Sequence, residues 1–79
     1  MFIITILCKD DDDYYIDYVN KGFKTFEEAQ EEMYKCANGE LRELQQIGDY
    51  EKINLTREFF IYNEDRELIT QYKIIEINN

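Results

Sequence analysis

The sequence predicts a single α+β domain over residues 1–79 with the element order ββαββ, in which two hairpins form an antiparallel sheet and one helix packs on one face. Three observations predict this class. Apolar and polar residues alternate near both ends of the chain, as in half-buried strands. Between them, apolar residues recur every three or four positions behind a capping signal. The chain is also 44% hydrophobic and 15% aromatic and has no proline, unlike disordered acidic chains.

The first two strands are expected to form a hairpin over residues 2–20. Alternation in Phe2–Lys9 places every second side chain on one face. These residues are Phe2, Ile4, Ile6 and Cys8. Asp10–Asp13 should be the turn, because four adjacent carboxylates repel one another in regular structure and aspartate favours turns. The second strand, Tyr14–Asn20, would place Tyr14, Ile16 and Tyr18 on one face.

The strongest local signal is a capping box from Thr25 to Glu28, in which hydroxyl and carboxylate would each accept a backbone N–H of the other residue. An apolar helical stripe follows. Its members are Phe26, Ala29, Met33, Cys36, Ala37, Leu41, Leu44 and Ile47. Asn38-Gly39 is a turn dipeptide that could end this helix and start a second one. Since the stripe keeps its phase across it, one helix of about 22 residues is favoured, with Gly48 as its C′ residue.

The rest of the chain predicts a loop and a second hairpin. Asp49–Asn54 is expected to be the loop, and a third strand should run from Leu55 or Thr56 to Tyr62. A turn over residues 63–66 would then lead into a long fourth strand, Glu67–Ile77. Because the third and fourth strands are joined by a short connection, they should pair antiparallel.

One helix covers only one face of such a sheet, and neither face has a clean polar pattern. One assignment turns Ile4, Ile6, Ile16, Leu68, Tyr72 and Ile74 toward the helix. The other face would then carry Ile3, Leu7, Tyr15, Val19, Ile69, Ile75 and Ile77. This is more apolar surface than a monomer normally exposes, so we expect the second face, or an edge strand, to be an interface. The alternative is that loops and chain ends fold over it.

Eighteen acidic residues against nine basic ones give a net charge of −9. Nucleic acids and anionic membranes are bound by Lys and Arg, so this charge disfavours both as direct partners. It favours a basic protein partner, because long-range electrostatic attraction would raise the rate of association with such a protein. The alternative is that the surplus acid only maintains solubility. The apolar run at Phe2–Cys8 lacks the basic n-region of a signal peptide and is too short to span a bilayer. Two cysteines are also too few for a secreted disulfide scaffold. A cytoplasmic location is therefore expected.

No catalytic, metal or cofactor site is expected. The chain has neither histidine nor serine, which removes the usual general base and the commonest hydroxyl nucleophile. Cys8 and Cys36 fall on predicted core faces and have no zinc-site spacing. Asp10–Asp13 lacks the alternating ligands and the glutamate of an EF-hand loop. We therefore expect a binding protein that is not an enzyme.

The residues expected to bind a partner combine acid with tyrosine, which is enriched at interface hot spots. They are Asp10, Asp11, Asp12, Asp13, Tyr14, Tyr15, Asp17, Glu27, Glu28, Glu31 and Glu32. Acids arrayed along a hairpin and a helix could imitate spaced phosphates and occupy a nucleic-acid channel on another protein. The alternative is an ordinary solvated helix face beside a turn.

In its length, charge, tyrosine content and ββαββ plan, and in the acidic segments Asp10–Asp13 and Glu27–Glu32, the chain resembles the small acidic proteins of phages and mobile elements. Several of those inhibit host defence, including anti-CRISPR proteins that block a nuclease's nucleic-acid site. The resemblance is to overall character, so no functional residue is transferred from it. It implies an inhibitor acting in the host cytoplasm on a basic, nucleic-acid-handling host protein.

Two other functions remain open from the sequence. One is a non-catalytic structural or accessory protein that forms a homodimer or larger homo-oligomer through its sheet face or edge. The other is a binder of a small ligand, although no pocket residues stand out in the sequence.

Overall fold

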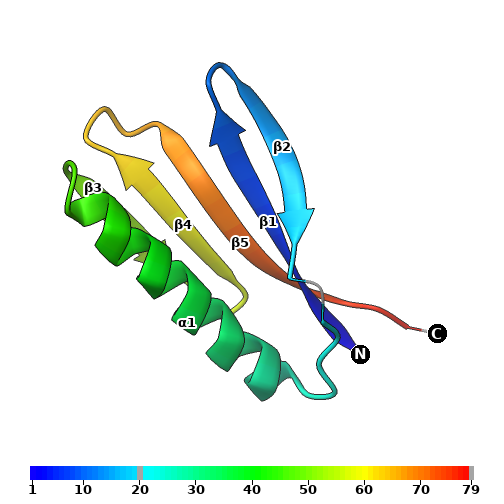
Figure 1. The fold of residues 1–79 in the computed structure, drawn as a ribbon. Helices are drawn as coiled ribbons and strands as arrows, with labels where there is room; N and C mark the ends of the chain where they lie inside the picture. The colour runs from blue at the N-terminus through cyan, green and yellow to red at the C-terminus, as the bar shows by residue number, and fades with distance from the viewer. Residues whose placement is uncertain (20, 79) are drawn as a thin grey trace.

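The computed structural model describes residues 1–19 and 21–78, in which one helix packs on one face of a five-stranded antiparallel sheet (Figure 1). The elements in chain order are β1 (Phe2–Asp10), β2 (Asp13–Tyr18), α1 (Phe26–Gln45), β3 (Tyr50–Asn54), β4 (Glu58–Asn63) and β5 (Leu68–Glu76). The α+β class and the single covering helix agree with the sequence prediction. The molecule is elongated, with extents of 40 × 23 × 18 Å.

The predicted order ββαββ is wrong, because the chain after the helix forms three strands. The segment expected to be a loop contains β3, which pairs with β4 from Tyr50↔Asn63 to Asn54↔Phe59. Its residues are mostly polar and give no alternating pattern. The strand therefore forms through pairing with β4 across a short turn, a tertiary effect that local sequence does not encode.

The strands lie in the order β2-β1-β5-β4-β3, so the first and last strands of the chain are neighbours near the middle of the sheet. Their register pairs Ile4 with Ile74 and Ile6 with Tyr72. The ladder continues past β5, where the Ile77 N–H donates to the Met1 carbonyl at 2.7 Å. The two predicted hairpins are thus joined through β1 and β5 and leave β2 and β3 as the edges.

The first hairpin forms as predicted, with a shorter turn. Asp10 pairs with Asp13, and only Asp11 and Asp12 lie between the strands. Asp11 has φ 55°, in the left-handed region that aspartate tolerates better than most residues. The predicted second strand extended to Asn20, which lies outside the described residues.

The helix is a single one, as favoured, and it runs unbroken through Asn38-Gly39. The Thr25 hydroxyl accepts from the Glu28 N–H at 3.2 Å, which confirms the N-cap. The predicted C-terminus is wrong: the helix ends at Gln45, and no glycine of the described residues has positive φ. The last turn tightens instead, since the Gln46 N–H donates to the Glu43 carbonyl.

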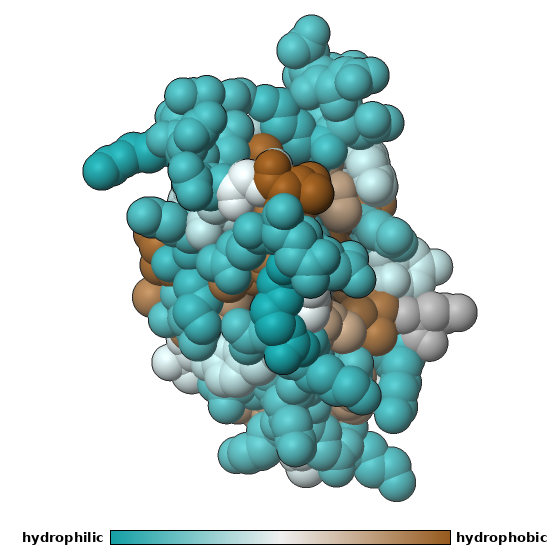
Figure 2. Space-filling model, turned by 60° about the vertical axis from the view of Figure 1, so that its left-hand side comes forward, coloured by the Kyte–Doolittle hydropathy of each residue, from teal (hydrophilic) through white to brown (hydrophobic). Residues whose placement is uncertain are grey.

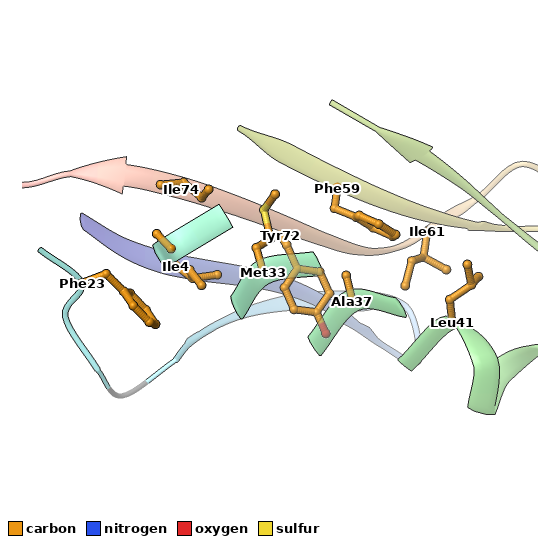
Figure 3. Close-up of a cluster of buried hydrophobic side chains, with 10 residues drawn as sticks. Ile4, Phe23, Met33, Ala37, Leu41, Phe59, Ile61, Tyr72 and Ile74 are labelled. Atoms are coloured by element: carbon orange, nitrogen blue, oxygen red, sulfur yellow. The ribbon is translucent and has the colours of Figure 1, made fainter. Parts of the chain in front are cut away.

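The core lies between α1 and the sheet, where side chains from both layers point toward one another (Figure 3). The helix supplies Ala29, Met33, Ala37 and Leu41, and the strands supply Ile4, Phe59, Ile61, Tyr72 and Ile74. Phe23 closes one end through a two-way backbone bridge to Phe2. Burying each large apolar side chain contributes roughly 1.5–3 kcal/mol to the hydrophobic term.

Candidate functional site

The acidic turn is at the end of the hairpin farthest from the chain termini (Figure 1). Asp10, Asp11, Asp12 and Asp13 are all exposed there. Near this end, the Lys9 ammonium forms an ion pair with Glu67 from the loop before β5. That contact raises the pKa of Lys9 and lowers the pKa of Glu67, so one cation near the four aspartates is already neutralised.

The three other predicted residues of the hairpin lie on two faces of β2. Tyr14 is on the face turned away from α1, and its hydroxyl donates to the Leu68 carbonyl at 2.9 Å. Tyr15 and Asp17 point to the same side as the helix, because they pair with Cys8 and Ile6. Both stay exposed there, since α1 contacts β1, β3, β4 and β5 but does not reach β2. The Tyr15 hydroxyl also forms a hydrogen bond with Cys8, and this bond raises the pKa of Tyr15.

The predicted helix acids are Glu27, Glu28, Glu31 and Glu32, in the first two turns of α1. They do not form a purely acidic patch. Glu28, Glu31 and Glu32 line a shallow hollow together with Lys21, Phe23 and Lys35. The Glu32 carboxylate also accepts from the Cys36 thiol at 3.1 Å. Two lysines therefore offset part of the negative charge at the start of the helix.

The structure does not bring the hairpin acids and the helix acids together. The helix begins beside the start of β1, where the Phe2 and Phe26 rings lie 6.0 Å apart. The four aspartates begin with Asp10, the last residue of this nine-residue strand, about 26 Å from Phe2 at 3.3 Å per residue. A single flat contact that covers both groups would need most of the length of the molecule.

The face of the sheet opposite the helix is uncovered in the described chain, and its residues differ from those expected. Ile16 was placed toward the helix and Tyr15 away from it; the register reverses both, because Ile16 pairs with Leu7. Val19 was also placed on the open face, but it packs against the core. The β1–β2 register, which the sequence leaves undetermined, decides all three positions.

A row of side chains crosses this open face through directly paired positions. It consists of Ile16, Leu7, Gln71, Phe60 and Ile53. Ile16 is 74% exposed and Ile53 49% exposed, at the two edges of the sheet. Between them, the Gln71 amide donates to the Glu58 carboxylate at 2.8 Å. The row is therefore apolar at both ends and polar in the middle. By contrast, the side of the molecule that carries β3 is largely hydrophilic, with small, separated hydrophobic patches (Figure 2).

The sequence predicts that an edge strand could be an interface but does not say which strand, and the structure shows that β2 is one of the two edges. The Val19 N–H donates to the Ile4 carbonyl, and bonded pairs alternate along an antiparallel ladder. The bonded positions of β2 are therefore Asp13, Tyr15 and Asp17, while the backbone groups of Tyr14, Ile16 and Tyr18 point away from β1. All six side chains of β2 are exposed. No helix or loop among the described residues covers this edge.

The opposite edge is better protected. The Tyr50 carbonyl, at the start of β3, accepts from the Gln45 side chain at 3.2 Å. Lys52 reaches back to the Asn38 side chain on α1. The helix thus contacts β3 directly, whereas it makes no contact with β2. Residues 51–54 of β3 are nevertheless exposed, so the difference between the two edges is one of degree.

Neither cysteine of the described residues has an activated thiol. Burial raises the pKa of both the Cys8 and the Cys36 thiol, which favours the less nucleophilic protonated form. Within residues 1–19 and 21–78, no group of three His, Cys, Asp or Glu side chains is arranged to hold a metal ion. No helix in the same ranges is long and apolar enough to cross a membrane.

Comparison with known proteins adds no family: no family model, curated protein or solved structure matches the chain significantly.

Proposed function

We propose that this chain is a non-catalytic protein-binding domain that inhibits a basic, nucleic-acid-handling protein through its β1–β2 hairpin. The observation that carries the proposal is the exposure of β2 on both faces and along its edge, directly beside the four aspartates of the turn. A strand with three tyrosines and one isoleucine exposed to solvent is unusual in a monomer, whereas tyrosine is common in interface hot spots.

Charge supports a basic partner. Asp10–Asp13 and Asp17 place five carboxylates on the hairpin, within a chain of net charge −9. A protein groove that binds nucleic-acid phosphates is lined by Lys and Arg, and such a groove would attract this hairpin. The helix acids lie too far away to enter the same contact, so the proposed site comprises the hairpin residues alone. An anti-defence inhibitor of the phage type, acting on a host nuclease, is the specific form of this proposal.

The test uses two variants that remove the same charge from opposite ends of the molecule. One changes Asp10, Asp11, Asp12 and Asp13 to Asn; the other changes Glu27, Glu28, Glu31 and Glu32 to Gln. Immobilised wild-type protein and both variants are exposed to bacterial lysate at low and moderate salt, and captured proteins are identified by mass spectrometry. We expect a basic partner that the wild type and the helix variant retain and that the hairpin variant loses.

The identified partner is then challenged with a DNA duplex. Displacement of the chain by the duplex supports occupation of the nucleic-acid site. Equal loss of the partner in both variants would reduce the effect to net charge, and retention by the hairpin variant would contradict the proposal.

A second function, self-association through the sheet, is favoured by the apolar ends of the row on the open face. In that case Ile16 and Ile53 would be covered by another copy of the chain. Light scattering at high concentration measures this directly: self-association requires a mass of at least twice 9.7 kDa. A mass of 9.7 kDa would exclude it.

A further inference from the structure

We propose that the β2 edge binds its partner by strand addition, and that the partner supplies an extended segment in which basic residues alternate with apolar ones. This inference rests on the proposed function and specifies how the partner is recognised. It follows from three properties of β2: the direction of its backbone groups, the different chemistry of its two faces and the nature of its protection.

The backbone of β2 is ready to accept another strand. The ladder to β1 has a regular register without a bulge, so the outward positions are evenly spaced. Tyr14 and Ile16 direct both their N–H and C=O groups outward. The Tyr18 N–H is occupied by the Asp17 carboxylate at 2.8 Å, which leaves its carbonyl as the acceptor. Peptides that add to exposed sheet edges gain affinity from main-chain groups of this kind.

The two faces of β2 define the side chains that an added strand would present. Asp13, Tyr15 and Asp17 lie on the side of the helix, and Tyr14, Ile16 and Tyr18 lie on the open face. Successive residues of an added strand also point to alternate faces. A complementary segment would therefore place Lys or Arg beside the two aspartates, and apolar or aromatic residues beside Ile16 and its neighbours.

Charge also decides between such a segment and a second copy of the chain. Exposed edges are commonly protected by proline, bulges or charges, and β2 has only charges. Pairing two copies of β2 would bring four aspartates of the strands together, between molecules of net charge −9 each. A basic strand would instead neutralise Asp13 and Asp17. The same carboxylates thus oppose self-pairing and favour a cationic partner.

The probe for this proposal is a synthetic peptide of about eight residues, near the length of a typical strand, that alternates lysine with isoleucine or tyrosine. Two control peptides have the same residues with N-methyl groups on every second amide, on one edge or on the other. Only methylation of the edge that faces β2 should prevent binding, because the other edge stays in solvent. A third control has the same composition in a non-alternating order.

Amide hydrogen exchange of the full chain, measured by NMR, is the decisive readout. In the free protein the Tyr14 and Ile16 amides face solvent and should exchange fast. Strand addition should slow both of them on addition of the alternating peptide. A cation that merely adsorbs to the acidic surface would shift signals near Asp10–Asp13 without protecting these two amides.

Variants of β2 sharpen the test. Ile16→Pro removes one outward N–H and no bond to β1, and it should weaken binding of the alternating peptide about five-fold or more. Ile16→Thr keeps that N–H and controls for the lost side chain. Asp13→Asn and Asp17→Asn should each weaken binding about two- to five-fold at low salt and have little effect at high salt.

The outcomes separate the two proposals. Binding of the alternating peptide without protection of Tyr14 and Ile16, or equal binding of both methylated peptides, would overturn strand addition and leave the hairpin as a binding surface. If protection of the two amides rises with protein concentration in the absence of peptide, a second copy of the chain occupies the edge, and the proposal of a basic partner is wrong. If strand addition is seen but the lysate experiment finds no partner that depends on the hairpin, the proposed function fails separately.

Discussion

The Tyr72 hydroxyl of β5 donates to the Glu40 carboxylate of α1 at 2.6 Å, and the Thr70 hydroxyl donates to the other oxygen of the same carboxylate. Tyr72 is 4% exposed and Thr70 2% exposed. One glutamate in the C-terminal half of the helix therefore satisfies two hydroxyls that the sheet directs into the core. This is the only pair of side-chain hydrogen bonds from α1 to β5 in the described residues.

Glu40→Ala is expected to lower the free energy of unfolding by roughly 1–3 kcal/mol, because it leaves two buried hydroxyls without their acceptor. Urea denaturation followed by circular dichroism measures this loss. Glu43→Ala is the matched control, since Glu43 is exposed on the same helix and its removal should change stability by less than about 0.5 kcal/mol. Equal effects of the two substitutions would show that the hydrogen bonds from Tyr72 and Thr70 do not contribute, and that Glu40 affects stability only as a residue of the helix.

Stability should fall at alkaline pH through Tyr72. Burial raises the pKa of this phenol, and the hydrogen bond to Glu40 raises it further. The raised pKa stabilises the fold fully below the unfolded value of about 10, and this contribution is lost as the pH rises above it. A single such group lowers the free energy of unfolding by about 1.4 kcal/mol per pH unit there.

Tyr72→Phe removes this proton linkage, so its unfolding free energy should depend less steeply on pH above about 10 than that of the wild type. Tyr15 and the two cysteines, whose pKa values are also raised, titrate in both proteins and cancel in the comparison. Denaturation curves at several alkaline pH values measure the two slopes. Parallel slopes would mean that Tyr72 already ionises in the folded state.

Gly39→Ala should stabilise the protein by about 0.5–1 kcal/mol, which corresponds to a rise in Tm of about 2–8 °C. Gly39 lies inside α1, and a Cβ there would meet no heavy atom within 4 Å. Alanine therefore gains helix propensity without a clash. Gly22→Ala should show no such gain, because its Cβ would lie 2.6 Å from the Met1 sulfur. Destabilisation by Gly39→Ala would indicate a special role for this glycine.

Arg66 occupies the left-handed region with φ 63° in the turn between β4 and β5. Arg66→Gly and Arg66→Ala both remove the guanidinium, but only glycine relieves the backbone strain. We expect the glycine variant to be more stable than the alanine variant by about 1 kcal/mol, as thermal denaturation would show. A more stable alanine variant would mean that the turn relaxes to a negative φ without glycine.

The sequence predicts those elements that local signals define. Alternation defines β1, and the Thr25 hydroxyl caps α1 as its capping box requires. The apolar stripe keeps the helix intact across Asn38-Gly39. A glycine in a helix lowers its stability by only about 1 kcal/mol, and the burial of Ala37 and Leu41 on either side stabilises the helix by more than that. At β1 and at the helix N-cap, local preference and tertiary packing agree; at Asn38-Gly39, packing outweighs the local turn preference.

The elements that the sequence does not predict depend on pairing between distant segments. The strand β3 contains few apolar residues and forms because β4 and α1 flank it. The position of Ile16 on the open face depends on the β1–β2 register, and the two-residue turn at Asp11 and Asp12 sets that register. The two acidic groups are far apart because they lie at opposite ends of β1. The sequence shows which residues are acidic but not where β1 places them in space.

The pairing of β1 with β5 also has a kinetic consequence. Phe2 lies opposite Glu76 in the central ladder, so the chain must close a loop of nearly its whole described length before the middle of the sheet exists. Closing such a loop lowers the entropy of the chain, and no contact between the two end strands offsets this loss until they meet. We therefore expect folding in the slower range of small domains, limited by the meeting of the two end strands, while α1 and the β1–β2 hairpin form and dissolve many times beforehand.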